Sequence, residues 1–138
     1  MRRLAATIGL GLLASCGSPE TNDFYLSCSI PEQGTFPEVE IDLQVRPRTG
    51  TMLELQDGVF RDVCYGKGFE CGKVMISDSL ITQSITYPDP DGGRPRRQDF
   101  RLDRQTGAVT YSYYDSAGNS GGVWNGTCEQ RDEPPVKG

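Results

Sequence analysis

The sequence predicts a small all-β domain, an antiparallel meander of about eight or nine short strands that forms either a barrel or a sandwich. Apolar and polar residues alternate in short segments, turn residues separate these segments, and no stretch keeps a helical period. Four cysteines lie in the same region, and this even number predicts two disulfides if the chain is exported, as its N-terminal segment, described below, indicates. We expect this single domain at residues 24–130, followed by a disordered tail at 131–138.

The first two expected strands have the clearest alternation. In residues 24–30 apolar side chains occupy the even positions, which places Cys28 on the core side. In residues 38–45 the aliphatic face, expected to point to the core, consists of Val39, Ile41, Leu43 and Val45. The other face consists of Glu38, Glu40, Asp42 and Gln44. This second strand should therefore have one face in water.

Shorter segments follow in the middle of the chain. The expected strands there are residues 51–56, 59–64, 73–77 and 80–87. In the first of them Leu53 and Leu55 alternate with polar residues, so both leucines are expected to face inward. Turns are expected at Pro47–Gly50 and Asp57–Gly58, because proline and glycine favour the dihedral angles that tight turns need.

The last part of the domain reads as a loop, a hairpin and a closing strand. Residues 88–95 contain three prolines and two glycines, which break helices and strand ladders, so they form a surface loop. The expected strands are residues 98–104, 108–115 and 122–128. Trp124 and Cys128 share one face of the closing strand, as their spacing requires.

Disulfide connectivity is open from sequence alone, since four cysteines allow three pairings. We expect Cys28–Cys128 and Cys64–Cys71, because Cys28 and Cys128 face the core from the first and last strands, which meet if the meander closes. The second pair would close a hairpin-sized loop. A four-cysteine zinc site is the alternative, but these spacings do not fit zinc ligands. No metal and no cofactor are expected.

The N-terminal segment has the organisation of a signal peptide. Arg2 and Arg3 precede an apolar run over residues 4–13, which ends in Leu13-Ala14-Ser15-Cys16. The run is about ten residues long, half of what a membrane-spanning helix needs. We therefore expect residues 1–15 to be a signal peptide.

Leu13-Ala14-Ser15-Cys16 resembles the lipobox of bacterial lipoproteins. The resemblance implies cleavage before Cys16 and attachment of lipid to that cysteine, which would hold the protein to a membrane. In that family an Asp after the cysteine marks inner-membrane retention, whereas this chain has Gly17 and Ser18, so the resemblance implies the outer membrane, facing the periplasm. Residues 16–23 would then be a polar tether. An ordinary secretory signal with a nearby cysteine is the alternative.

Charge and composition exclude several function classes. Loss of Arg2 and Arg3 with the signal leaves 12 of the 14 basic residues against 19 acidic ones, a formal net charge of −7. Nucleic acid is therefore not an expected partner, because phosphate binding needs a basic surface. The chain also has no histidine, which removes the usual general base and the commonest zinc ligand.

The loop between Cys64 and Cys71 is the candidate partner-binding segment. It holds Tyr65, Lys67 and Phe69 among glycines, and a disulfide would preorganise these side chains for binding. The alternative is that the two aromatic rings fold back and cap the core.

Two charged groups are weaker candidates. The acidic strand face of Glu38, Glu40 and Asp42 could supply the paired carboxylates of a glycoside hydrolase, but a solvated strand face is the commoner origin of such a pattern.

The loop at 88–95 and the residues after it carry charges of both signs. Asp89 and Asp91 have a spacing found in calcium loops, without the later ligands of such a loop. Arg94, Arg96 and Arg97 form a basic cluster that could contact lipid phosphates or an acidic polymer; a solvated loop is the alternative.

These observations favour a membrane-anchored envelope lipoprotein whose small β domain is not an enzyme and binds a protein or polymer of the envelope. Two other functions remain open. One is a cell-wall or glycan hydrolase that uses carboxylates, and the other is a lysozyme-inhibitor-like lipoprotein, which rests on architecture alone.

Overall fold

The computed structural model of the chain describes residues 22–64 and 66–135. The expected signal peptide, the lipidation site Cys16 and the loop residue Tyr65 lie outside these residues.

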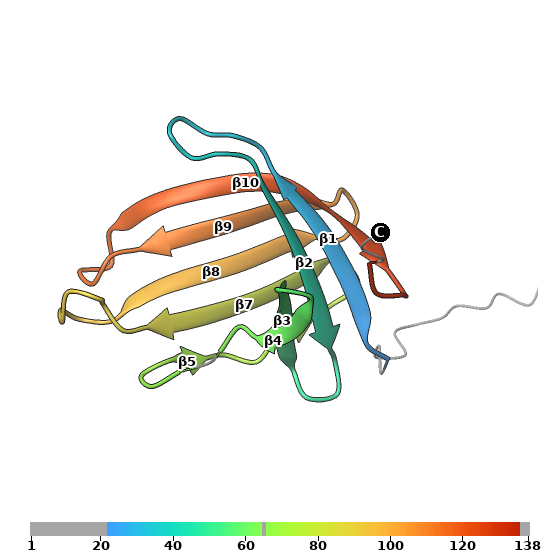
Figure 1. Cartoon of the computed structure of the whole chain (residues 1–138), viewed down its shortest axis with the longest axis horizontal. Helices are drawn as coiled ribbons and strands as arrows, with labels where there is room; N and C mark the ends of the chain where they lie inside the picture. The colour runs from blue at the N-terminus through green and yellow to red at the C-terminus, as the bar shows by residue number, and fades with distance from the viewer. Residues whose placement is uncertain (1–21, 65, 136–138) are drawn as a thin grey trace, which may run out of the picture.

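The described chain forms one curled antiparallel sheet, a half-barrel, as the all-β prediction requires (Figure 1). Its strands are β1 (Phe24–Ile30), β2 (Val39–Arg46), β3 (Thr51–Gln56), β4 (Val59–Asp62), β5 (Glu70–Cys71), β6 (Met75–Ile76), β7 (Leu80–Tyr87), β8 (Arg96–Asp103), β9 (Ala108–Tyr114) and β10 (Ser120–Arg131). Within residues 22–64 and 66–135 no helix is long and apolar enough to cross a membrane.

The strand order is that of a meander whose first and last strands meet. The order across the sheet is β4-β3-β2-β1-β10-β9-β8-β7-β5, with β6 also paired to β7. β1 and β10 are antiparallel neighbours, so the expected closure of the chain ends is confirmed. The sheet is neither a closed barrel nor a sandwich, because it stays open between β4 and β5.

Both expected disulfides are confirmed, and they cross-link the sheet at two different places. Cys28 and Cys128 face each other directly across β1 and β10, with their Cα atoms 3.9 Å apart. Cys64 follows β4 and Cys71 ends β5, so the Cys64–Cys71 bond joins the two edges of the sheet. The four-cysteine zinc alternative is therefore wrong.

Backbone hydrogen bonds hold the open edges near each other. The amide of Val74 donates to the carbonyl of Gly50 at 2.8 Å, which connects the segment after β5 to the turn between β2 and β3. The amide of Gly72 donates to the carbonyl of Ser84 in β7 at 2.9 Å. The segment 72–74 thus bridges the gap that strand pairing leaves.

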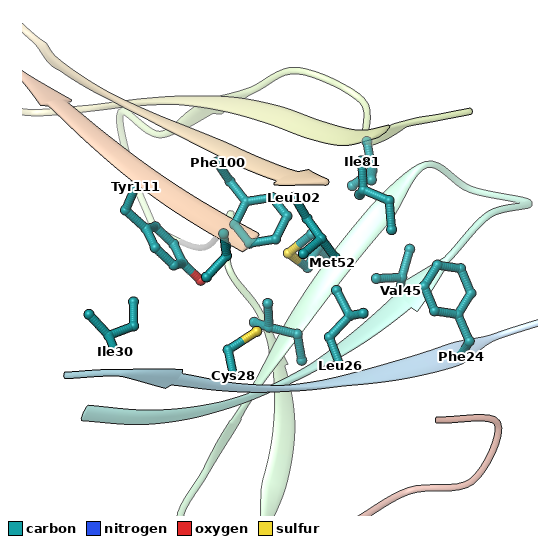
Figure 2. Packing of buried hydrophobic residues seen from close by; sticks show 13 residues of the cluster. Phe24, Leu26, Cys28, Ile30, Val45, Met52, Ile81, Phe100, Leu102 and Tyr111 are labelled. Carbon is teal, nitrogen blue, oxygen red and sulfur yellow. The ribbon is translucent and has the colours of Figure 1, made fainter. Parts of the chain in front are cut away.

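The core fills the concave side of the curled sheet. Its fully buried members include Leu26, Val45, Ile81 and Val109, which come from four different strands. Figure 2 shows how side chains from β1 and from β8 and β9 meet across this interior. The alternation predicted for residues 24–30 is confirmed, since Cys28 is 1% exposed.

The orientation predicted for the third strand is wrong. Met52 belongs to the core cluster, whereas Leu53 is buried outside it. The cause is the register with β2, in which Glu54 lies opposite Leu43 and Met52 lies opposite Val45. Directly paired residues share a face, so β3 presents Met52 and Glu54, not Leu53, to the concave side.

Several expected boundaries shift by a few residues. β4 ends at Asp62, β8 begins at Arg96, and the expected strand at 73–77 shortens to β6. β10 is longer than expected at both ends, with a register irregularity between Ser120 and Gly122.

Candidate functional site

The concave face carries a hollow at the end of the half-barrel where β1 finishes. One part, the Glu54 part, has a volume of about 350 Å³ and is lined by Glu54, Gln56, Phe69, Tyr87 and Gln98 among others. The other, the Trp124 part, has about 370 Å³ and is lined by Ile30, Phe36, Val39 and Trp124 among others. Ile41, Tyr111 and Tyr113 line both parts. We call the two adjoining parts together the concave hollow.

Aromatic rings that pack edge to face form the wall of the Trp124 part. The ring of Tyr113 lies 4.4 Å from that of Trp124, and the ring of Phe36 lies 5.1 Å from it on an edge-to-face contact. Such pairs prefer these geometries and fix one another. Trp124 is the only tryptophan of the chain, so its fluorescence reports on this wall alone.

The hairpin between β1 and β2 places apolar side chains at the rim. Gln33 and Phe36 exchange two backbone hydrogen bonds, and the Gln33 side-chain amide donates to the carbonyl of Asn125 in β10 at 3.1 Å. Phe36 and Val39 are nevertheless 54% and 43% exposed. The sequence predicted that Val39 would face the core, but it lies at the edge of the hollow.

The cysteine loop contributes one of its three candidate residues to the hollow. Phe69 is half-buried, lines the Glu54 part, and stacks on Tyr87 with ring centroids 6.3 Å apart. Lys67 is exposed and lines neither part. Phe69 is not a member of the core cluster, so it forms the rim of the hollow instead of capping the core.

Tyr111 lines both parts of the hollow. The side chain is 7% exposed and reaches inward from β9 toward the strand that carries Ile30 and Cys28 (Figure 2). Burial, and then the negative charge of Glu54, raise the pKa of Tyr111 above its ordinary value. The hydroxyl therefore stays protonated at neutral pH, and it has no hydrogen-bond partner among the described residues.

Tyr113 is in a similar environment. Burial raises the pKa of Tyr113, and the nearby groups of Tyr87 and Glu54 add to the same effect. The charge of Glu54 thus contributes to the raised pKa of both tyrosines that line the two parts of the hollow.

Glu54 is the one charged residue that lines the concave hollow in the described part of the chain. Its carboxylate forms no ion pair or hydrogen bond with the described residues. Arg61 lies opposite Glu54 on the edge strand β4, but it is exposed and does not line the hollow.

The acidic face of β2 lies elsewhere. Asp42 accepts a hydrogen bond from the hydroxyl of Ser27 at 2.8 Å, and Glu38 accepts one from Ser29 at 3.4 Å. Glu38, Glu40 and Asp42 line neither part of the concave hollow. The structure does not bring them into a pocket as paired carboxylates.

Two of the three clustered arginines have intramolecular partners. Arg96 forms an ion pair with Asp89 at 3.2 Å. Arg97 forms one with Asp99 at 3.2 Å and covers the ring of Tyr114 at 4.2 Å. Arg94 is exposed. Asp89 also accepts the amide of Asp91, so it organises the loop.

A hollow of about 620 Å³ lies on the opposite face, over β7, β8 and β9. Hydroxyl side chains such as those of Thr82 and Ser112 line it, and Ser84 already donates to Asp99 at 2.7 Å. Two of its polar groups are thus already paired with each other, and it has fewer aromatic rings than the concave hollow.

Comparison of the chain with protein-family models, with curated proteins and with solved structures found no match.

Proposed function

We propose that this protein is an envelope lipoprotein, anchored through lipid on Cys16 in the outer membrane, whose domain is a binding module and not an enzyme. The concave hollow is its binding site. The occupant is a small organic group, carried by a free molecule or by a protein or polymer of the envelope. The observation that carries the proposal is the aromatic hollow, whose two parts share Tyr111 and Tyr113 in their lining.

The size and lining of the hollow support this function. Small-molecule sites have volumes of about 300–1,000 Å³ and combine apolar and aromatic walls with a few polar groups. The concave hollow combines six aromatic side chains with Glu54, Gln56 and Gln98. The six are Phe36, Phe69, Tyr87, Tyr111, Tyr113 and Trp124.

The position of the tether also supports the proposed binding function. Asp23, just before β1, accepts a hydrogen bond from Gln44 at 3.0 Å and lies 3.7 Å from the Arg46 guanidinium. Ile30, at the other end of β1, borders the hollow. Six residue steps of a strand span ~20 Å, so a tether that ends at Asp23 holds the hollow away from its anchor.

The hydrolase alternative lacks its central requirement in this hollow. Glycoside hydrolysis uses two carboxyl groups on either side of the scissile bond, whereas Glu54 is the single carboxylate among the described residues that line the concave hollow.

The anchor is tested by Cys16→Ala. We expect the variant to accumulate as unprocessed precursor without acyl label, while its disulfides still form, because the domain begins several residues later. Labelling with a radioactive or clickable fatty acid, followed by electrophoresis, measures this. Normal acylation of the variant would exclude Cys16 as the anchor.

The hollow is tested with N-phenyl-1-naphthylamine, an uncharged fluorescent probe of apolar sites. We expect saturable binding to the full chain with quenching of Trp124 emission, because the indole lines the hollow. Phe69→Ala should weaken binding by roughly 3- to 10-fold, as loss of an aromatic contact does.

Phe60→Ala is the matched control for that variant. Phe60 is half-buried on β4, but its ring packs against Tyr25 at 5.6 Å and lines neither part of the hollow. Its replacement should leave probe affinity unchanged. Equal effects of Phe69→Ala and Phe60→Ala, or binding that leaves Trp124 emission unaltered, would contradict the proposed site.

A further inference from the structure

The charge distribution of the concave hollow limits the kind of group that it accepts. No lysine or arginine lines either part within the described chain, and Glu54 is the only acidic residue there. A second anion in the hollow would meet this charge without compensation. An anionic ligand is therefore disfavoured, whereas a cation would supply the partner that the carboxylate lacks.

The aromatic rings that line the hollow beside Glu54 also favour a cation. The face of an aromatic ring is electronegative, and cations bind over it within about 6 Å of the centroid, most strongly where water is excluded. Phe69, Tyr87, Tyr111 and Tyr113 line the same part of the hollow as Glu54. Both Tyr111 and Tyr113 are near enough for its charge to raise the pKa of their hydroxyls.

We propose that the concave hollow binds an organic cation, an alkylated ammonium group held by the carboxylate of Glu54 and by the rings of Phe69, Tyr87, Tyr111 and Tyr113. This inference rests on the proposed function and names the ligand class of the same site.

A metal ion fits the site less well than an organic cation does. Hard metal ions take six or more oxygen ligands, and the hollow offers one carboxylate among carbon-rich walls. An alkylated ammonium group has an apolar surface that the walls can bury and a diffuse charge that one carboxylate balances. The protonated hydroxyl of Tyr111 remains available as a hydrogen-bond donor to Glu54 or to the ligand.

Arg61 is the nearest candidate for an internal counter-ion. It faces Glu54 in the register of β3 and β4, and it is exposed at the edge of the sheet. No ion pair within 4.0 Å joins these two described residues. The variant Arg61→Gln therefore tests whether the arginine competes with the ligand.

The experiment compares three probes of similar size and different charge: benzyltrimethylammonium, benzyl alcohol and benzenesulfonate. Each competes with N-phenyl-1-naphthylamine on the full chain, and Trp124 emission gives a second readout. We expect the cation to bind about tenfold more tightly than the alcohol, and the sulfonate to bind most weakly. In Glu54→Gln the cation should no longer bind more tightly than the alcohol, while the affinity for the alcohol should stay within about twofold of its original value.

Glu40→Gln is the matched control, because it removes the same charge from an exposed position of the neighbouring strand outside the hollow. It should keep the preference for the cation, and Arg61→Gln should keep it within about twofold. Melting curves by circular dichroism confirm that each variant is folded.

The outcomes separate the two proposals. Equal affinities of the three probes, or a preference that survives in Glu54→Gln, would overturn the cation site while probe binding in the hollow remains. Failure of N-phenyl-1-naphthylamine and all three charged or neutral probes to bind would overturn the proposed function itself.

Discussion

Replacing both Cys28 and Cys128 by alanine is expected to lower the free energy of unfolding by about 4–5 kcal/mol, a larger loss than we expect from removal of the other disulfide. The bond spans 100 residues, so its removal restores the conformational entropy of nearly the whole domain in the unfolded chain. Cys28 is also buried, and its loss removes core contacts between β1 and the strands opposite. Urea unfolding followed by Trp124 emission measures the change.

The double variant Cys64→Ala/Cys71→Ala is the comparison. Its bond spans 7 residues, which corresponds to roughly 2–3 kcal/mol in the same entropy model. If the short-loop variant were the less stable of the two, closure of the sheet edges would matter more than the link between the first and last strands.

Gly126→Ala is expected to cost roughly 2–4 kcal/mol or to prevent folding, because a Cβ atom at this position would overlap the backbone of the neighbouring strand. The atoms that it would meet are the carbonyl oxygen of Ser29 and the Cα of Ile30, both in β1. Backbone atoms within a hydrogen-bonded ladder cannot move aside as a side chain can. The variant therefore has to separate β10 from β1, close to the link between Cys28 and Cys128.

Gly121→Ala in the same strand is the matched control. The nearest atom to its added Cβ is the carbonyl oxygen of Tyr113 at 3.5 Å, an ordinary contact. We expect a change in melting temperature of a few degrees at most, since the propensity difference is about 1 kcal/mol or less. A loss in Gly121→Ala as large as that in Gly126→Ala would show that glycine flexibility, and not the close approach of two backbones, explains the effect.

The strands were predictable where one face is apolar and the other is polar. Residues 24–30 keep this alternation without exception, and β1 has the expected bounds and burial. The same pattern placed Cys28 inward, and inward cysteines on the first and last strands were enough to predict both their disulfide and the pairing of β1 with β10. These features depend on local pattern and chain closure, which a single sequence contains.

The site was less predictable because it depends on register. β3 has apolar residues on both faces, and alternation alone favoured Leu53 and Leu55 as the inner set. Pairing with β2 instead turns Leu53 to the outer face of the sheet. Leu53 is buried there, opposite Gln44 of β2, which in turn lies opposite Tyr25 of β1. Glu54 was therefore missed as a candidate site residue. Once the register places Glu54 on the inner face, a carboxylate there indicates a candidate binding residue.

The cysteine loop illustrates a different limit. Its composition predicted exposed binding residues, and Phe69 does line the hollow, but Lys67 is exposed and lines neither part of it. Which side chain of a glycine-rich loop faces a site depends on backbone angles that the sequence leaves free. The partners of the basic cluster were not predictable from the sequence either. Arg96 pairs with Asp89 and Arg97 with Asp99, and no sequence pattern indicated that these residues would lie close together.

The bond between Cys64 and Cys71 has a consequence for self-association. Unpaired strand edges are templates for pairing with another chain, and proteins avoid aggregation by keeping such edges short or covered. Here the two edges are the four residues of β4 and the two-residue strands β5 and β6, and the disulfide links the residue two positions after β4 to the last residue of β5. Under reducing conditions this cross-link would be lost, and we expect the two short edges, then held by backbone hydrogen bonds such as that from Val74 to Gly50, to pair more readily with another chain.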